Sequence, residues 1–346
     1  MGYPFIQDAV ITDGHIYGVP ISVSITGLGY HEKNCEAVGI TKDKLPRDYM
    51  EWFDIIDWWI AQGCDEYPDF VLFEEIADGR TFLVGTVISA YIDYCQYTNT
   101  PLRFDTPVFR SLADRVDAID ADALNAQIKR DDYGMEYNPV SLFRGNQAYH
   151  DLECMGYYPD EKPLLLSVVQ GGEPHVAADV RLFIVNPASS RSEAAVRYIA
   201  CFLQGLPQEI DILLFSGNHD PVINENFAQE KSEFEEIYNE TKESLKTCSP
   251  DERLDLTERL QLVEGELANM DQYQWHISPE TISAYQQLTE ALFVRDQNIL
   301  ERNSSDGTLE IKSLVQRYIN REMTLDMFIR SADEMILFIE AEDGET

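Results

Sequence analysis

Positive charge is scarce in this chain of 346 residues. It carries 26 Lys and Arg against 62 Asp and Glu, which gives a formal net charge of −36 at pH 7. A surface with that balance repels nucleic-acid phosphates and anionic lipid headgroups, so we expect neither as a partner. Acidity is also an ordinary means of staying soluble outside the cell. The charge therefore excludes more functions than it identifies.

Long apolar runs and targeting signals are missing as well. No stretch approaches the roughly 18–20 apolar residues that cross a bilayer. Neither a basic-then-apolar leader nor a lipid-attachment cysteine precedes residue 13. Met1-Gly2 is not a myristoylation signal, because Ile6 stands where Ser or Thr is needed. The sequence as written predicts no export signal and no lipid anchor of its own.

Metal-binding and cofactor-binding motifs are few. The cysteines are widely spaced without a C-x-x-C pair, so we expect neither a zinc cluster nor a disulfide framework and interpret them as small buried apolar residues. Motifs of the G-x-x-x-x-G-K-[ST], G-x-G-x-x-G and G-x-S-x-G types are absent. We therefore expect no cofactor, no metal and no catalytic residue. The cysteines are Cys35, Cys64, Cys95, Cys154, Cys201 and Cys248.

One short segment does suggest catalysis. The letters GNHD at 217–220 follow an apolar run at 212–215 that we expect to be a strand, and a strand ending in G-N-H-D is typical of two-metal phosphoesterases. The letters DGH at 13–15 supply the D-x-H that such enzymes also need. The intervening G-D-x-x-D is missing, and a single histidine, His276, follows. A phosphoesterase stays an alternative, and a turn is the simpler interpretation.

Helix signals are clear through the middle and the end of the chain. Asp48 and Glu51 have capping-box spacing, and an apolar series from Trp52 to Trp59 then follows at helical spacing, which predicts core positions. Alternating β-branched residues over 19–25 predict a strand. Further helices are predicted over 31–38, 81–97, 107–119, 308–320 and 325–340. Another is predicted from a capping box at 190–193, with Ser190 as its N-cap, to a stop at Gly205. Further strands are predicted over 70–73, 164–169 and 180–185.

Residues 225–271 have a different character. Two apolar series follow the 3-4 spacing of packed helices, with charged residues between them and a proline-containing cap at 249–252. This pattern predicts an antiparallel helical hairpin that protrudes, with two ordinary surface helices as the alternative. The series are Phe234, Ile237, Thr241, Leu245 and Cys248, then Leu256, Leu260, Val263, Leu267 and Met270.

Three segments resemble bacterial extracellular solute-binding proteins, the substrate-capturing subunits of ABC importers. Residues 13–33 read DGHIYGVPISVSITGLGYHEK, residues 185–203 read VNPASSRSEAAVRYIACFL, and residues 315–329 read VQRYINREMTLDMFI. In that family the first motif lies well inside the mature protein, whereas here it begins at residue 13. The resemblance therefore implies a solute-binding protein that lacks its front portion.

The resemblance implies an α/β fold of the two-lobe, periplasmic-binding-protein-like type II kind, with an incomplete first lobe and the inserted hairpin. Residues 1–24 would form part of the N-lobe and the first hinge strand, and residues 25–178 the C-lobe. Residues 179–274 would return to the N-lobe and include the hairpin at 225–271. Residues 275–346 would be closing helices that span both lobes.

The implied function is non-catalytic capture of a small solute, most simply a carbohydrate, and its delivery to the permease. Sugars are typically held by aromatic faces and a few polar groups in a closing cleft. The implied location is extracellular, at the outer face of the membrane of a Gram-positive bacterium. The protein would be held there by a lipid anchor that is absent from this chain. The rival hypothesis is a remnant that acts only as a helical interaction module. The candidate ligand-binding residues are Ser24, Thr26, Arg80, Phe82, Trp275 and Ser278.

Overall fold

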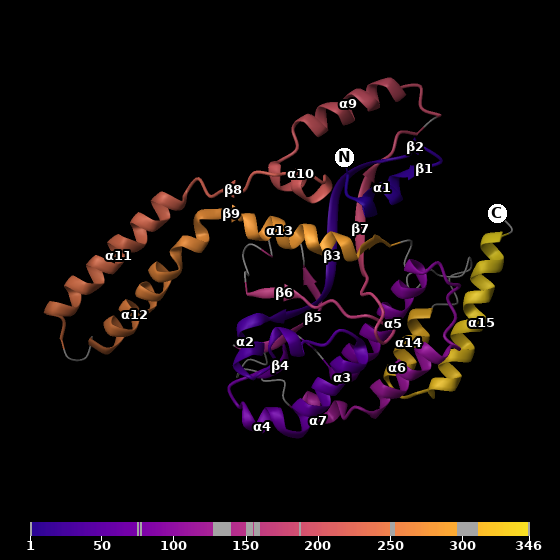
Figure 1. Ribbon diagram of the computed structural model, residues 1–346, viewed down its shortest axis with the longest axis horizontal. Helices are drawn as coiled ribbons and strands as arrows, with labels where there is room; N and C mark the ends of the chain where they lie inside the picture. Colours follow the sequence, from indigo (N-terminus) through magenta and orange to yellow (C-terminus); the bar gives the residue numbers. More distant parts are fainter. Residues whose placement is uncertain are drawn as a thin grey trace.

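One long strand, β3 (Val19–His31), organises the protein (Figure 1). The computed structural model describes residues 2–74, 76, 78–126, 140–149, 155, 160–186, 188–249, 253–295 and 311–344. The main sheet has the order β10-β7-β3-β5-β4, and β6 also pairs with β3. β7 pairs with the first part of β3, whereas β5 and β6 pair with the second part. The other strands are β4 (Val71–Glu74), β5 (Ser141–Tyr149), β6 (Glu161–Pro163), β7 (Val176–Phe183) and β10 (Leu292–Val294).

The two parts of β3 belong to two separate hydrophobic cores. Val23 and Ile25 are buried in a smaller core, and Leu28 and Tyr30 are buried in a larger one. Because successive strand residues point to opposite faces, the alternation of Val23 and Ile25 predicted from the sequence gives one buried face. The chain therefore passes from one lobe to the other around Thr26, without a break in the strand.

Helices dominate the larger lobe. Asp48 caps α3 by accepting a hydrogen bond from the N–H of Glu51, as predicted, and Trp52 and Trp59 are fully buried, so their prediction as core residues is confirmed. Full burial of one large apolar side chain stabilises the fold by roughly 1.5–3 kcal/mol. The helices are α2 (Glu32–Ala37), α3 (Tyr49–Trp58), α4 (Cys64–Glu66), α5 (Gly79–Tyr97), α6 (Pro107–Ala118), α7 (Ala121–Asn125), α14 (Ile311–Ile319) and α15 (Leu325–Gly344), with a 3-10 turn Lys42–Lys44 and a π-helical turn Trp59–Gly63.

The smaller lobe packs short helices against β3 and β7. Two buried tyrosines hold its core together, since the hydroxyl of Tyr3 donates to the carbonyl of Ile212 and that of Tyr285 donates to the carbonyl of Leu213. Each such bond contributes about 1 kcal/mol and satisfies a buried polar group. The elements are α1 (Pro4–Val10), β1 (Ile11–Thr12), β2 (His15–Ile16), α9 (Ser192–Gln204), α10 (Gln208–Leu214), α13 (Pro279–Leu288) and a 3-10 turn Thr289–Ala291.

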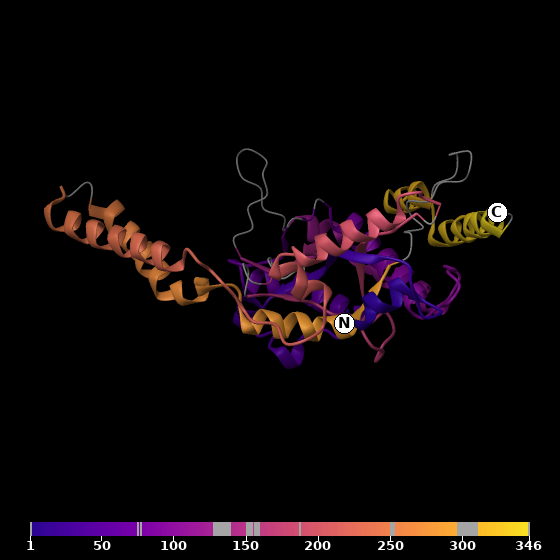
Figure 2. The ribbon, with the colours of Figure 1, turned by 90° about the horizontal axis from the view of Figure 1, so that it is seen from above.

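The predicted helical hairpin is present and extends away from the body, as both views show (Figures 1 and 2). α11 (Phe227–Thr247) and α12 (Arg253–Asn269) pack against each other, with Thr241 and Val263 buried between them. A 3-10 turn (Met270–Gln274) and the short pair β8 (Val222–Ile223) and β9 (Trp275–Ile277) form its base. The two apolar series of the sequence are thus the contact between the helices.

Several local predictions differ from the structure. Residues 164–169 were expected as a strand, yet beyond β6 only Ser167 makes an isolated bridge, to Asp48. Arg191 rather than Ser190 is the N-cap of α9, without a side-chain cap bond.

The cysteines are only partly as predicted. Cys201 is exposed, so its prediction as a buried residue is wrong, and Cys154 lies outside the described residues. Cys35 and Cys95 are buried, and Cys64 and Cys248 are partly so. Within the described ranges, no helix is long and apolar enough to cross a membrane.

Candidate functional site

The first candidate residues lie where β3 passes between the lobes. Ser24 points to the face opposite Val23 and Ile25, is exposed, and pairs in register with the exposed Asp179 of β7. Thr26 points to the same face, is half-buried, and pairs in register with Tyr149 of β5. The strand periodicity therefore brings two hydroxyls and a carboxylate to one face of the sheet at the lobe junction.

The residue directly after β10 contributes a cation to this face. Leu292 and Val294 contact the smaller core, so Phe293 and Arg295 point the other way. The guanidinium of Arg295 pairs with Asp93 on α5, and burial raises the pKa of the Asp93 carboxyl while the pairing with Arg295 opposes that rise. Sequence reasoning missed both residues. The available signals were a lone carboxylate in the apolar helix over 81–97 and a cation directly after an apolar strand.

Arg80 and Phe82 lie in the first turn of α5, and both have protein partners. The ring of Phe82 lies 4.9 Å from that of Phe73 and 6.0 Å from that of Trp52, measured between centroids. The Arg80 side chain is only 12% exposed and pairs with Asp117. Its ligand-binding role stays a prediction, while the structure gives it a role in tying helices together.

Trp275 and Ser278 lie beside the base of the hairpin. Trp275 is half-buried on β9, opposite Ile223 of β8. The hydroxyl of Ser278 accepts a hydrogen bond from the N–H of Thr281 at 3.1 Å and so caps α13. The candidates thus form three pairs on β3, on α5 and around β9. In the part of the chain that the structure describes, no hydrogen bond, ion pair or ring contact joins one pair to another.

The segment at 217–220 does not follow the strand that a phosphoesterase site requires. The apolar residues before it belong to α10, so that strand prediction is wrong. Nε2 of His219 lies 2.7 Å from the carbonyl oxygen of Phe215, close to the end of α10, and Asp13 sits in the β1–β2 turn with a φ of 51°. Among the described residues, no His, Cys, Asp and Glu cluster could hold a metal ion. The segment is irregular backbone after a helix.

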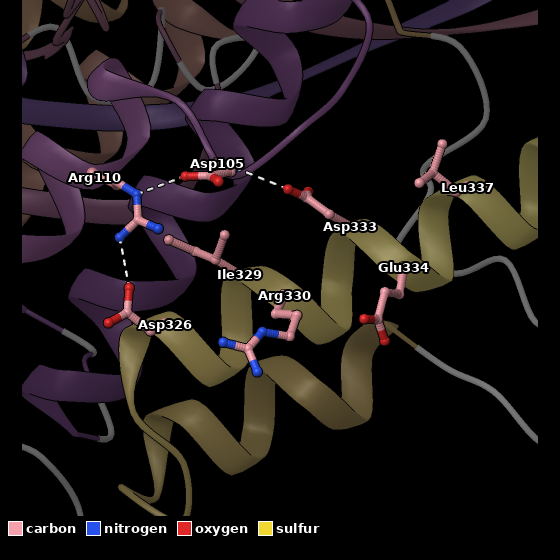
Figure 3. Close-up of a pocket in the computed structure, with 8 residues that line it drawn as sticks. All are labelled: Asp105, Arg110, Asp326, Ile329, Arg330, Asp333, Glu334 and Leu337. Atoms are coloured by element: carbon pink, nitrogen blue, oxygen red, sulfur yellow. Dashed lines mark hydrogen bonds and ion pairs between the residues drawn. The ribbon is translucent and has the colours of Figure 1, made fainter.

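A cavity of about 340 Å³ lies outside the lobe junction, between α15 and the start of α6 (Figure 3). Arg110 pairs with both Asp105 and Asp326, at 2.8 Å each, and these pairs raise the pKa of the guanidinium. The Asp333 carboxylate accepts hydrogen bonds from the backbone N–H groups of Phe104 and Asp105. Most charges in this cavity are therefore occupied in joining α6 to α15.

Comparison with solved structures identifies the fold. The sugar-binding protein MalE from Xanthomonas citri matches 99% of this chain and 75% of its own, with a TM-score of 0.50 and 14% identity. A structure reported for xylan utilization by Caldanaerobius polysaccharolyticus matches 96% of this chain and 76% of its own, also with a TM-score of 0.50 and 14% identity. The chain has their fold. The predicted α/β fold of solute-binding proteins is therefore confirmed, although no family model and no curated relative matches the sequence.

Proposed function

We propose that the protein captures a small carbohydrate between its two lobes and delivers it unchanged to the permease of an ABC importer. The observation that carries this proposal is β3, which runs unbroken through two separate cores and brings polar side chains to the junction. The shared fold with a sugar-binding protein supports the same function. Such a protein works outside the membrane, and we propose an extracellular location, held at the membrane by a lipid anchor.

The proposed site uses hydroxyl and aromatic groups, because sugars present hydroxyls around apolar ring faces. Ser24 and Thr26 would hydrogen bond to the solute, and the partly exposed indole of Trp275 would stack on it. Phe82 would offer a second aromatic edge. Arg80 and Ser278 already have protein partners, so we place them at the margin of the site.

Solute binding would favour a closed arrangement of the lobes through contacts that only the closed state makes. The strand at Thr26 would then act as one hinge. No bond of the solute would break. This distinguishes the proposal from catalysis, and it requires that the released solute be chemically identical to the bound one.

Isothermal titration calorimetry with maltose- and xylose-based oligosaccharides tests the proposal. We expect saturable binding, weakened about 10-fold or more by Thr26→Val, because a lost hydrogen bond to a bound polar group costs about 1–3 kcal/mol. Thr257→Val is the control, since Thr257 is exposed on the hairpin. Trp275→Ala should weaken binding by a similar amount. Binding to no sugar, or equal loss in Thr257→Val, would contradict the proposed site.

A second candidate function rests on the hairpin. α11 and α12 extend away from the body and leave Leu254 and Leu262 exposed, at 67% and 71%. A helical module of this kind could bind another protein while the lobes bind no solute. A sugar-binding result that is unaffected by removal of the hairpin would favour the transport function.

A further inference from the structure

The last turns of α5 join the larger lobe to strands of the smaller one. α5 packs its buried residues, among them Tyr91 and Ile92, into the larger core. Its opposite face carries Asp93 and, one turn later, Tyr97. Both side chains contact residues in β10 or directly after it, and β10 packs in the smaller lobe.

The first contact is a bidentate ion pair. Nε of Arg295 donates to Oδ1 of Asp93 at 3.0 Å, and Nη2 donates to Oδ2 at 2.9 Å. Side-chain exposure is 23% for Arg295 and 16% for Asp93, so water screens the pair only weakly. The backbone N–H of Arg295 also donates to the carbonyl of Ala178 at 3.1 Å. Arg295 is therefore tied to β7 in the smaller lobe, whereas Asp93 is carried by a helix of the larger core.

The second contact is aromatic. The ring of Tyr97 stacks on that of His175, with centroids 3.3 Å apart and planes at 21°. The same ring meets Phe293 edge-on at 5.7 Å. His175 directly precedes β7, and Phe293 lies in β10. One tyrosine of the larger lobe therefore contacts the start of β7 and the neighbouring strand β10. Burial lowers the pKa of the His175 imidazole, which favours the neutral ring in this stack.

A change in the angle between the lobes would have to break these contacts. Separating a poorly hydrated ion pair takes each charge away from its counter-ion, which is unfavourable until water replaces that contact. We therefore expect the angle between the lobes to change in a discrete step and not by continuous bending. Packed contacts switch between alternative arrangements and do not deform gradually.

We propose that Asp93 and Arg295, supported by the stack of Tyr97 on His175, form a latch that holds the two lobes at the angle seen here. The latch sets the orientation of the lobes in the absence of solute. It does not depend on which solute binds, or on whether one binds at all.

Spin-label distance measurements between the lobes test the latch without any ligand. The labels go on exposed positions of well-packed elements, at Ser283→Cys on α13 and Lys42→Cys in the larger lobe. The test variants are Asp93→Asn and Arg295→Met. The control is Arg144→Met, because Arg144 pairs with Glu161 at 2.7 Å inside the larger lobe and its exposure of 26% matches that of Arg295. The labelled background carries serine in place of Cys64, Cys154, Cys201 and Cys248.

We expect one narrow distance distribution in the parent protein and in Arg144→Met, and a shifted or broadened one in both latch variants. An unchanged distribution in folded Asp93→Asn and Arg295→Met would overturn the proposal. If circular dichroism shows either variant unfolded, the exchange Asp93→Arg with Arg295→Asp and the separate variant Tyr97→Leu are measured instead. The latch then requires a broadened distribution in Tyr97→Leu, and an unchanged one overturns it.

Because no sugar is present, failure of this test leaves the proposed transport function standing. Conversely, a finding that no sugar binds does not contradict the latch. If one of the maltose- or xylose-based oligosaccharides binds the parent protein, its affinity for the latch variants is measured as a further comparison. Loss of the latch should change the affinity through the closing equilibrium, whereas Arg144→Met should leave it unchanged.

Discussion

Arg80 on α5 and Asp117 on α6 form an ion pair of 2.7 Å in which the Arg80 side chain is 12% exposed. The same guanidinium donates to the carbonyls of Tyr318 and Ile319 at the end of α14, and it lies 5.2 Å from the centre of the Tyr318 ring. The Tyr318 hydroxyl donates to Asp117 in turn, and burial raises its pKa. One cation thus joins three helices of the larger lobe.

Replacing Arg80 by methionine should lower stability more than it lowers sugar affinity. The change keeps most of the apolar stem but leaves Asp117 without its cation and two carbonyls without their donor, which we expect to cost about 2–4 kcal/mol. Chemical denaturation measures this directly. The control is Lys33→Met, because the pair of Lys33 with Asp160 is exposed, at 75% and 47%, and should contribute less than about 1 kcal/mol. A selective loss of affinity without destabilisation would instead support the predicted ligand contact.

Trp52 allows a test of packing against hydrogen bonding. It is fully buried, with Phe73, Phe82 and Tyr49 around it, and its indole N–H has no hydrogen-bond partner within the described residues. Trp52→Phe therefore removes volume but no hydrogen bond, and it should cost less than Trp52→Ala, for which we expect about 3–5 kcal/mol. Urea unfolding measures the loss of stability in each variant. Equal losses would show that the phenylalanine ring does not replace the packing of the indole.

Local signals explain why many helices were predictable. Asp48 caps α3, Ser278 caps α13 and Thr324 caps α15 through hydrogen bonds between residues three apart, and such spacing is legible in the sequence. The hairpin was predictable for the same reason, because its apolar series repeat within each helix. The apolar run before 217–220 was misread, since a short apolar run fits a buried helix as well as a strand.

The lobe junction could not be read from sequence in the same way. Asp93 and Arg295 are 202 residues apart, and each is an unremarkable charge in a chain rich in charges. Their meeting depends on the pairing of β10 with β7, and β10 (Leu292–Val294) is too short to show a strand pattern. Of the candidate site, the face of β3 with Ser24 and Thr26 followed from alternation, but its charged neighbours followed only from the fold.

His175 makes stability depend on pH. Its pKa is lowered chiefly by burial, with Glu173 opposing the change, so the unfolded chain binds a proton at a higher pH than the folded protein does. The contribution of the neutral ring is present above the ordinary pKa of about 6.5 and is lost as the pH falls from there toward the lowered value. His175→Phe keeps a ring against Tyr97 without a titrating group. Thermal melts should show its melting temperature rising relative to the parent below pH 6.5, and a constant difference would contradict this.

Removal of the hairpin should leave the two lobes folded. α11 and α12 pack mainly against each other and the 3-10 turn below them, so few contacts of the body are lost with them. At the base, the N–H of Asn224 donates to the carbonyl of Gln274 at 3.1 Å, and its side chain donates to that of Tyr273. The two ends therefore lie close together, and a short Gly-Ser linker in place of residues 227–270 can join them.

We expect this deletion to keep the cooperative unfolding of the body and the sugar affinity of the full chain, because β3, α5 and the latch are untouched. Asn224→Ala in the full chain is the matched comparison. It leaves both helices in place but removes the side-chain bonds of a residue that is 8% exposed, which should cost about 1–3 kcal/mol. Calorimetry on both variants separates the outcomes. Loss of sugar binding on deletion would place the hairpin in the site, and loss of folding would show that it supports the smaller lobe.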